Sequence, residues 1–151
     1  MASSESSLLK LELQTDGENS TTWGSKTNTN LNLIEQAAHG LSSVAVTASD
    51  VTLTDTAYAE SEARKTYINV TGALTGNRSI VVPARTHLYH VFNNTTGAFV
   101  LTVSTSAGTG IAVVQGERMI LWCDGTNVVN AVTDADTKEN AQTIIAQRVF
   151  S

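Results

Sequence analysis

HLYHVFNNTTGAFVLTVSTSAGTGIAVVQGERMILWCDGTNVVNAV, residues 87–132, is the stretch that decides the fold. Short runs rich in Val, Ile, Leu, Phe and Thr alternate with glycine-containing breaks, which is typical of strands joined by turns. Asp124-Gly125 predicts a tight hairpin between Met119–Cys123 and Thr126–Val132, because glycine accepts the positive φ that such a turn needs. The stretch therefore predicts an antiparallel meander or half of a sandwich.

The upstream sequence adds further short strands and one helix. Strands are predicted at Ser43–Thr47, Val51–Thr54, Thr66–Thr71 and Ser79–Val82. The clearest helix is Asn28–His39, where Leu31, Ile34 and Ala38 form an apolar stripe. A helix of about eleven residues is marginal alone, so it is expected to pack on something.

The predicted fold is mainly β: an antiparallel β-sandwich or barrel knob with one short N-terminal helix and extended terminal arms. Residues 1–42 would form an N-terminal arm, a tryptophan loop and the helix, and would serve in attachment. Residues 43–133 would form the knob. Residues 134–151 fit either a helix, with Ala141, Ile144, Ile145 and Val149 on one face, or an extended apolar arm.

The N-terminal arm is predicted from an alternation of apolar and polar residues. Within Leu8–Leu13, the side chains of Leu9, Leu11 and Leu13 would share one side of a short strand or extended arm. Such an arm leaves a strand edge exposed unless a neighbour covers it. We therefore expect this segment to contact another molecule.

Composition excludes several classes of protein. The 151 residues carry a net charge of -5, and only 15% are charged, below the usual share of about 25%. Nucleic acid is not expected as a partner, because phosphate binding needs a basic stripe. The sequence shows no secretory signal and no apolar run of the roughly 18 residues that span a membrane. The single Cys123 is expected to be a small buried hydrophobic residue.

Four groups of polar residues are candidates for chemistry. They are His87 with His90, Cys123 with Asp124, Gly108 with Gly110, and the acidic cluster of Asp134, Asp136 and Glu139. Residues three apart on a strand point to opposite faces, so one zinc ion cannot bind both histidines. The other groups lack a partner base, a following helix, or the glycine of a calcium loop. The sequence therefore predicts no enzyme, no metal site and no cofactor.

The first quarter of the chain carries a more specific pattern, L-x-L-x-x-x-G-x-N-x-x-x-W-G-x-x-x-N-x-N-L-x-x-I-E-x-A-x-x-G. Its positions are occupied by Gly17, Asn19, Trp23, Gly24, Asn28, Asn30, Leu31, Ile34, Glu35, Ala37 and Gly40. This pattern resembles that of tailed-bacteriophage virion proteins. Looser similarity continues in L-T-G-x-R near Leu74–Arg78, V-x-N-x-T-x-G near Val91–Gly97 and D-G-T-N-V at Asp124–Val128.

The resemblance implies a non-enzymatic structural protein of the virion, assembled in the host cytoplasm. Proteins of this kind occur in tail fibres and as head decoration (cement) proteins, commonly as homotrimers with β-sandwich knobs. The chain has no room for a shaft and a receptor-binding tip, so a capsid decoration protein that stabilises the head is the leading interpretation. Its partners would be itself and the major capsid protein or other virion proteins. A tail fibre or tail adaptor protein involved in host attachment is the alternative.

Subunit or particle contacts are expected at apolar residues of both ends, namely Leu9, Leu11, Leu13, Trp23, Leu31, Ile34, Ile144 and Phe150. Trp23 is expected to anchor the Thr15–Lys26 loop against the helix. A small carbohydrate-binding module is an alternative of another class, and it would need exposed aromatic residues. Aromatic residues make up 5% of the chain, and Trp122 is expected in the core because it lies in an apolar strand.

Overall fold

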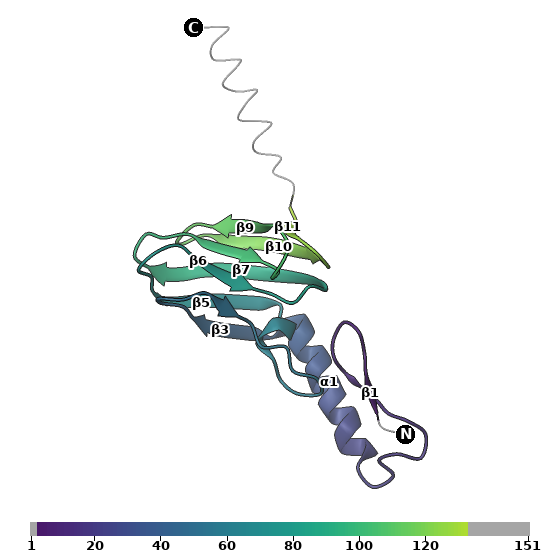
Figure 1. The fold of residues 1–151 in the computed structure, drawn as a ribbon. Helices are drawn as coiled ribbons and strands as arrows, with labels where there is room; N and C mark the ends of the chain where they lie inside the picture. The colour runs from purple at the N-terminus through teal and green to yellow at the C-terminus, as the bar shows by residue number, and fades with distance from the viewer. Residues whose placement is uncertain (1–2, 133–151) are drawn as a thin grey trace, which may run out of the picture.

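The chain folds as two β-sheets that share one core, with a helix leading away from one edge. The computed structural model describes residues 3–132 (Figure 1). The five-stranded sheet has the order β11-β10-β7-β5-β3, and the four-stranded sheet has the order β4-β6-β8-β9. The first comprises β3 (Leu41–Ala45), β5 (Tyr67–Ala73), β7 (Thr86–Thr96), β10 (Arg118–Asp124) and β11 (Val128–Asn130). The second comprises β4 (Val51–Thr52), β6 (Arg78–Val81), β8 (Leu101–Ser104) and β9 (Gly110–Val113).

The chain crosses between the two sheets at every step from β3 to β8. Successive strands of one sheet are therefore parallel neighbours: β3 with β5, β5 with β7, β4 with β6, and β6 with β8. This path makes three stacked coils, each of which gives one strand to each sheet. The last three strands pair antiparallel with their neighbours and close the stack.

A mainly β fold with one N-terminal helix is confirmed, whereas the wholly antiparallel arrangement is wrong. Antiparallel pairing holds for the predicted hairpin at Asp124-Gly125, where Cys123 lies opposite Val128. The two sheets of the described chain do not close into a barrel. The boundary expected between residues 42 and 43 falls inside β3, and residues 134–151 lie outside the described residues.

The bends between the sheets are held by the side chains of Asp50 and Asn77. The Asp50 carboxylate accepts the backbone N–H of Ser79 (2.8 Å), and the Asn77 amide oxygen accepts the backbone N–H of Val100 (3.1 Å). Each bend is thereby bonded to the next coil. Asp and Asn side chains also accept backbone hydrogen bonds in hairpin turns. Turn residues alone therefore do not show whether a connection is a hairpin within one sheet or a bend from one sheet to the other.

The core lies between the sheets and follows the alternation of each strand. In β7 and β10 the odd-numbered residues point inward, and Tyr89, Val91 and Leu121 among them are fully or almost fully buried. They meet the inward residues of the other sheet, among them Leu101 and Val103. The Tyr89 hydroxyl donates to the carbonyl of Ala63 (3.1 Å), so this buried phenol is satisfied.

Helix α1 (Trp23–His39) begins five residues before the predicted start at Asn28. Hydroxyl groups within its first turns make this possible. Ser25 donates to the carbonyl of Thr22 (2.8 Å), and Thr29 donates to the carbonyl of Ser25 (3.0 Å). Residues that usually favour turns are thus satisfied by the helix's own backbone.

The N-terminal segment is a docked hairpin, so the extended arm predicted there is wrong. The expected strand Leu8–Leu13 is reduced to β2 (Glu12–Leu13), which pairs with β1 (Ser4–Glu5). The Asn30 side chain of α1 accepts from the Glu12 N–H (2.9 Å) and donates to the Glu12 carbonyl (2.8 Å). Lys26 adds an ion pair to the Glu12 carboxylate (3.0 Å).

A buried arginine fastens this hairpin region to the body of the protein. Arg64 ends the 3₁₀ helix η1 (Glu62–Arg64) and is fully buried. Its guanidinium donates to the carbonyls of Leu9 (2.8 Å), Thr56 (3.0 Å) and Ala59. One side chain therefore joins the β1–β2 loop to the segment between β4 and η1, two segments that no sheet connects.

Candidate functional site

The outer face of the five-stranded sheet holds an open groove, called here the sheet groove. It has a volume of about 670 Å³ and crosses β3, β5, β7 and β10. Its outward side chains include Leu41, Tyr67, His90, Phe92, Arg118 and Ile120. Strand register places Leu41, Tyr67, His90 and Ile120 in one row across the four strands.

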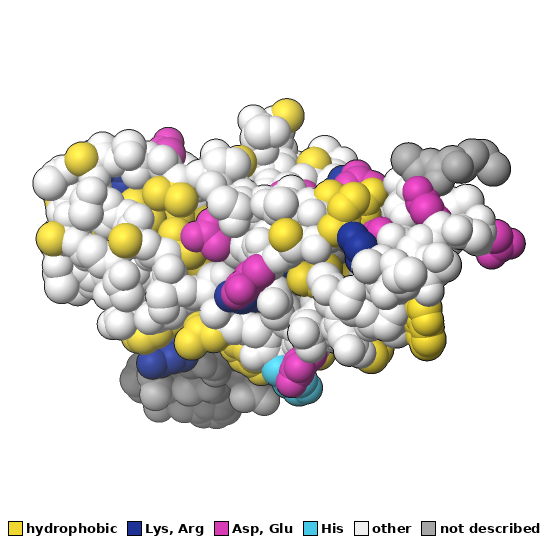
Figure 2. Space-filling view, turned by 90° about the horizontal axis from the view of Figure 1, so that it is seen from below, with side chains coloured by type: hydrophobic (Ala, Val, Ile, Leu, Met, Phe, Trp, Pro, Cys, Tyr) yellow, Lys and Arg dark blue, Asp and Glu magenta, His cyan; other side chains and the backbone are white. Residues whose placement is uncertain are grey.

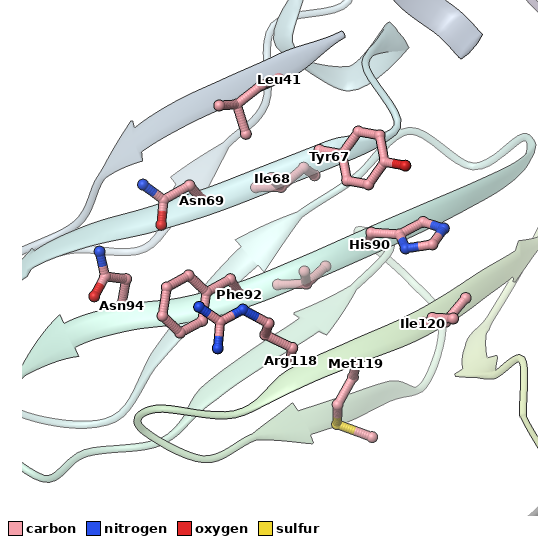
Figure 3. Close-up of a pocket in the computed structure, with 11 residues that line it drawn as sticks. Leu41, Tyr67, Ile68, Asn69, His90, Phe92, Asn94, Arg118, Met119 and Ile120 are labelled. Atoms are coloured by element: carbon pink, nitrogen blue, oxygen red, sulfur yellow. The ribbon is translucent and has the colours of Figure 1, made fainter. Parts of the chain in front are cut away.

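The groove side chains contact one another across the strands (Figure 3). The Arg118 guanidinium lies over the Phe92 ring, 3.6 Å from its centroid. The rings of Tyr67 and His90 are 4.9 Å apart. Stacking of this kind covers the charge of Arg118 with apolar surface while leaving its N–H groups available.

Apolar exposure continues beyond the groove on the same face. Leu88 and Trp122 are paired in register, both point outward, and both are exposed. Trp122 was predicted to lie in the core. This was wrong because only one side of its strand faces the core, and Trp122 lies on the other side. The inward neighbours of Trp122, Leu121 and Cys123, are buried, and Trp122 itself is 44% exposed.

The groove lining contains no carboxylate. Asn69 and Asn94 contribute amides, and Arg118 contributes the one full charge of the lining. On the face drawn in Figure 2, charged and hydrophobic side chains are scattered among uncharged polar side chains and backbone. A face that combines apolar side chains with so little charge desolvates at low cost, which is a property of contact surfaces.

Helix α1 presents a second apolar surface, called here the helix seam. It consists of Thr27, Leu31, Ile34 and Ala38, and of these Leu31, Ile34 and Ala38 are exposed. Within residues 3–132 the stripe does not pack on the protein, and the packing of Leu31 and Ile34 on a partner stays a prediction. The packed side of the helix instead contains Leu33, its one buried residue, because the Asn30 and Lys26 bonds to Glu12 fix the helix rotation.

The other predicted contact residues have separate positions. Leu9 and Leu11 are partly buried beside the N-terminal hairpin, whereas Leu13 is exposed. Trp23 is the first residue of α1 and is 63% exposed, so it does not anchor the Thr15–Lys26 loop within the chain. Its contact with a partner stays a prediction. Ile144 and Phe150 lie outside the described residues.

Of the candidate catalytic residues, Cys123 and His87 are on the inward side of their strands, whereas Asp124 is exposed in the hairpin turn and His90 lines the sheet groove. Cys123 is fully buried, as predicted, and its thiol faces the Pro83 carbonyl (3.7 Å). His87 lies opposite Cys123 in register, a neighbour that the sequence did not indicate. The thiol has no exposed surface for a substrate to reach. In the described chain no group of three or more His, Cys, Asp or Glu side chains is placed to hold a metal ion.

His87 should make stability depend on pH. Burial lowers the pKa of His87 below its ordinary value of 6.5, and the nearby Arg85 charge lowers it further. The unfolded chain therefore binds a proton at this residue near pH 6.5, whereas the folded chain does not. His87 imposes no penalty on folding above about pH 6.5, and it destabilises the fold progressively as the pH falls below that value.

We expect His87→Gln to reduce the fall in melting temperature between about pH 7.5 and pH 5.5. Differential scanning calorimetry at both pH values measures this fall. His39→Gln, at the exposed end of α1, is the matched control and should keep the wild-type dependence. An unchanged pH dependence in His87→Gln would contradict the assignment.

Sequence reasoning missed the sheet groove because its residues are far apart in the chain. Leu41, Tyr67, His90 and Ile120 become a row only through the strand register. The sequence nevertheless contained a local signal for an apolar outer face. Leu88 and Trp122 are large apolar residues that alternate along their strands with buried residues. A strand that is apolar on both sides indicates that both of its faces are covered.

None of the family models, curated proteins or solved structures with which the chain was compared matches it. Within residues 3–132, no helix combines the length and the apolar character needed to cross a membrane.

Proposed function

We propose that this chain is a non-enzymatic structural protein of a tailed-bacteriophage virion, which assembles as a homotrimer and decorates the head. The observation that carries the proposal is the apolar surface left exposed by the folded chain, on the helix seam and on the outer sheet face. Such surfaces are typical of proteins that act by association. The sequence pattern around Trp23 and Asn28 resembles that of phage virion proteins. This resemblance is the reason for proposing that the assembly is a virion.

A decoration protein stabilises a shell by binding the assembled lattice rather than the loose subunits. Many modest contacts across subunit junctions then add up against the pressure of the packaged genome. The stacked coils suit this role, because they form a self-supporting body whose N-terminal helix and hairpin lie at one edge (Figure 1). The shell would be contacted from that N-terminal end.

Quantitative mass spectrometry of purified particles tests this function. We expect hundreds of copies per particle, and we expect that stripping the protein lowers the temperature at which heads release DNA. A handful of copies that scale with the tail proteins would move the assignment to a tail fibre or tail adaptor. Absence of the protein from particles would contradict the proposal.

Tyr67, Phe92 and Trp122 favour a second candidate, a carbohydrate-binding module. All three lie on the outer face of the five-stranded sheet, and Asn69 and Asn94 place amides beside Phe92 in the groove. Aromatic faces and amides together can bind sugar rings. Saturable binding of a defined oligosaccharide, lost in Tyr67→Ala, would favour this candidate over the structural one.

A further inference from the structure

We infer that the helix seam and the sheet groove form one continuous contact between copies of this chain. In this contact each α1 packs in parallel against the same helix of its neighbours, and the outer faces of the five-stranded sheets meet beside them. The inference rests on the proposed assembly and deepens it, because it names the surface through which copies associate. Its occupant is a second copy of the chain.

The spacing of the seam fits the same helix in another copy. Thr27, Leu31, Ile34 and Ala38 are separated by four, three and four residues. This alternation is the seam of a coiled coil, in which each side chain enters a hole on the facing helix. Leu31 then takes the a position and Ile34 the d position, a combination that favours three or four helices over two.

Contacts among residues 3–132 leave the seam unused. The other side of α1 is occupied by Leu33, which is buried, and by Asn30 and Lys26, which bond to Glu12 of the hairpin. The Ala37 carbonyl accepts a hydrogen bond from the Thr66 hydroxyl at the start of β5. These bonds fix the rotation of the helix, so the seam is held facing away from its own chain.

Leu41 joins the two surfaces. It follows the helix after the single residue Gly40, is 59% exposed, and lines the sheet groove. Gly40 is tightly enclosed, since a Cβ there would lie 2.4 Å from the Gln36 carbonyl oxygen. The connection from helix to strand is therefore short and fixed, which makes seam and groove adjoining parts of one rigid surface. Seen from the β3 edge, hydrophobic side chains recur along the lower margin of the molecule (Figure 2).

The distribution of charge favours this surface as the contact between identical chains. Each copy has a net charge of -5, so two copies repel one another over most orientations. The seam and the groove lining contain no carboxylate, and Arg118 is stacked on Phe92. Two copies can therefore approach through this surface with little repulsion.

The apolar area is sufficient for a stable interface. Eleven large hydrophobic side chains are exposed in the described chain, and seven lie on or beside the two surfaces. They are Trp23, Leu31 and Ile34 of the helix, and Leu41, Tyr67, Leu88 and Trp122 of the sheet. At roughly 100 Å² each, they provide about 700 Å² per copy, close to the roughly 800 Å² that a standard interface buries on each side.

Cysteine cross-linking tests the parallel packing directly. In a parallel seam, residue 34 faces its own counterpart, so oxidised Ile34→Cys should give a covalent dimer on non-reducing gels. Native Cys123 is fully buried and does not compete. Asn32→Cys, also exposed but away from the seam, should remain a 16.0 kDa band. A missing dimer in Ile34→Cys, or equal dimer in both variants, would overturn the inference.

Sedimentation of the full chain gives the second test. The wild type should sediment as an oligomer at micromolar concentration, and Leu31→Ser/Ile34→Ser should sediment as a 16.0 kDa monomer. Tyr67→Asp, in the sheet groove, should weaken association at least tenfold. Leu8→Ser removes a leucine of similar exposure, 51% against 57% for Leu31, and should leave the oligomer intact. A monomeric wild type, or seam or groove variants that associate like the wild type, would overturn the inference.

These outcomes are distinguishable from failure of the proposed function. An oligomer that depends on the seam and the groove, yet is absent from phage particles, would contradict the virion assignment and support the interface. A wild-type oligomer that binds an oligosaccharide at Tyr67 would overturn the interface, because the groove must be covered between copies. Circular dichroism of each variant verifies that the two sheets remain folded.

Discussion

Gly72→Ala is expected to lower the free energy of unfolding by about 3–5 kcal/mol. Gly72 has a φ of +124° in β5, and a Cβ at this position would lie 2.0 Å from the carbonyl oxygen of Val46. Neither partner can move freely, because the N–H of Val46 is bonded to the carbonyl of Thr71 (2.8 Å). Relieving the clash would open the pairing between the first and second coils.

Gly116→Ala is the matched control for this substitution. Gly116 also has a positive φ, +84°, but a Cβ there would meet no atom within 4 Å. It should cost only the backbone strain of about 1–2 kcal/mol. Denaturant unfolding monitored by circular dichroism measures both values. Equal losses in the two variants would mean that the close approach at Val46 does not limit stability.

Arg64→Met should cost a similar amount, about 3–5 kcal/mol, for a different reason. Methionine retains much of the apolar stem but removes the donors to the carbonyls of Leu9, Thr56 and Ala59. Buried carbonyls that lose a charged donor remain unsatisfied, and each carries a desolvation penalty of about 1–3 kcal/mol. The N-terminal hairpin should loosen before the sheets do.

Hydrogen exchange by mass spectrometry separates that local effect from global unfolding. Peptides covering residues 3–13 should exchange faster in Arg64→Met, while peptides of β7 keep most of their protection. Arg78→Met is the control, because among the described residues the Arg78 side chain donates only within its own turn, to the Asn77 carbonyl and the Thr75 hydroxyl. Unchanged exchange at residues 3–13 would contradict the anchoring role.

Local patterns in the sequence predicted the strands and the helix but not how the strands pair. The Asp124-Gly125 hairpin was predicted correctly, since its two strands are neighbours in the chain and the turn residues specify it. Parallel pairs such as Tyr67 with His90 join residues separated by a whole coil. No local turn encodes that distance, and the turn residues at Asp50 and Asn77 fit a hairpin equally well.

The contact residues likewise include some that a local pattern predicted and others whose position depends on how the strands pair. Leu31 and Ile34 were predicted as contacts, and both are exposed in the folded chain. The helix was expected to pack on something, and on its own chain it does so through other residues, namely Leu33, Asn30 and Lys26. An apolar stripe predicts a partner without saying whether the partner is the same chain. Tyr67 and Trp122 were missed as surface residues because their position depends on both faces of a sheet.

The equal spacing of the second and third coils in the two sheets shows how the stack can be lengthened. Tyr67 lies opposite His90 and Arg78 lies opposite Leu101, so both sheets repeat after 23 residues between the second and third coils. Duplicating a segment of this length would add one strand to each sheet and lengthen the stack by about 4.8 Å. The closing hairpin and the helix would be unchanged, because each coil contacts only its neighbours. Evolution could therefore adjust the distance between the two ends of the stack in fixed increments, by insertion of whole modules.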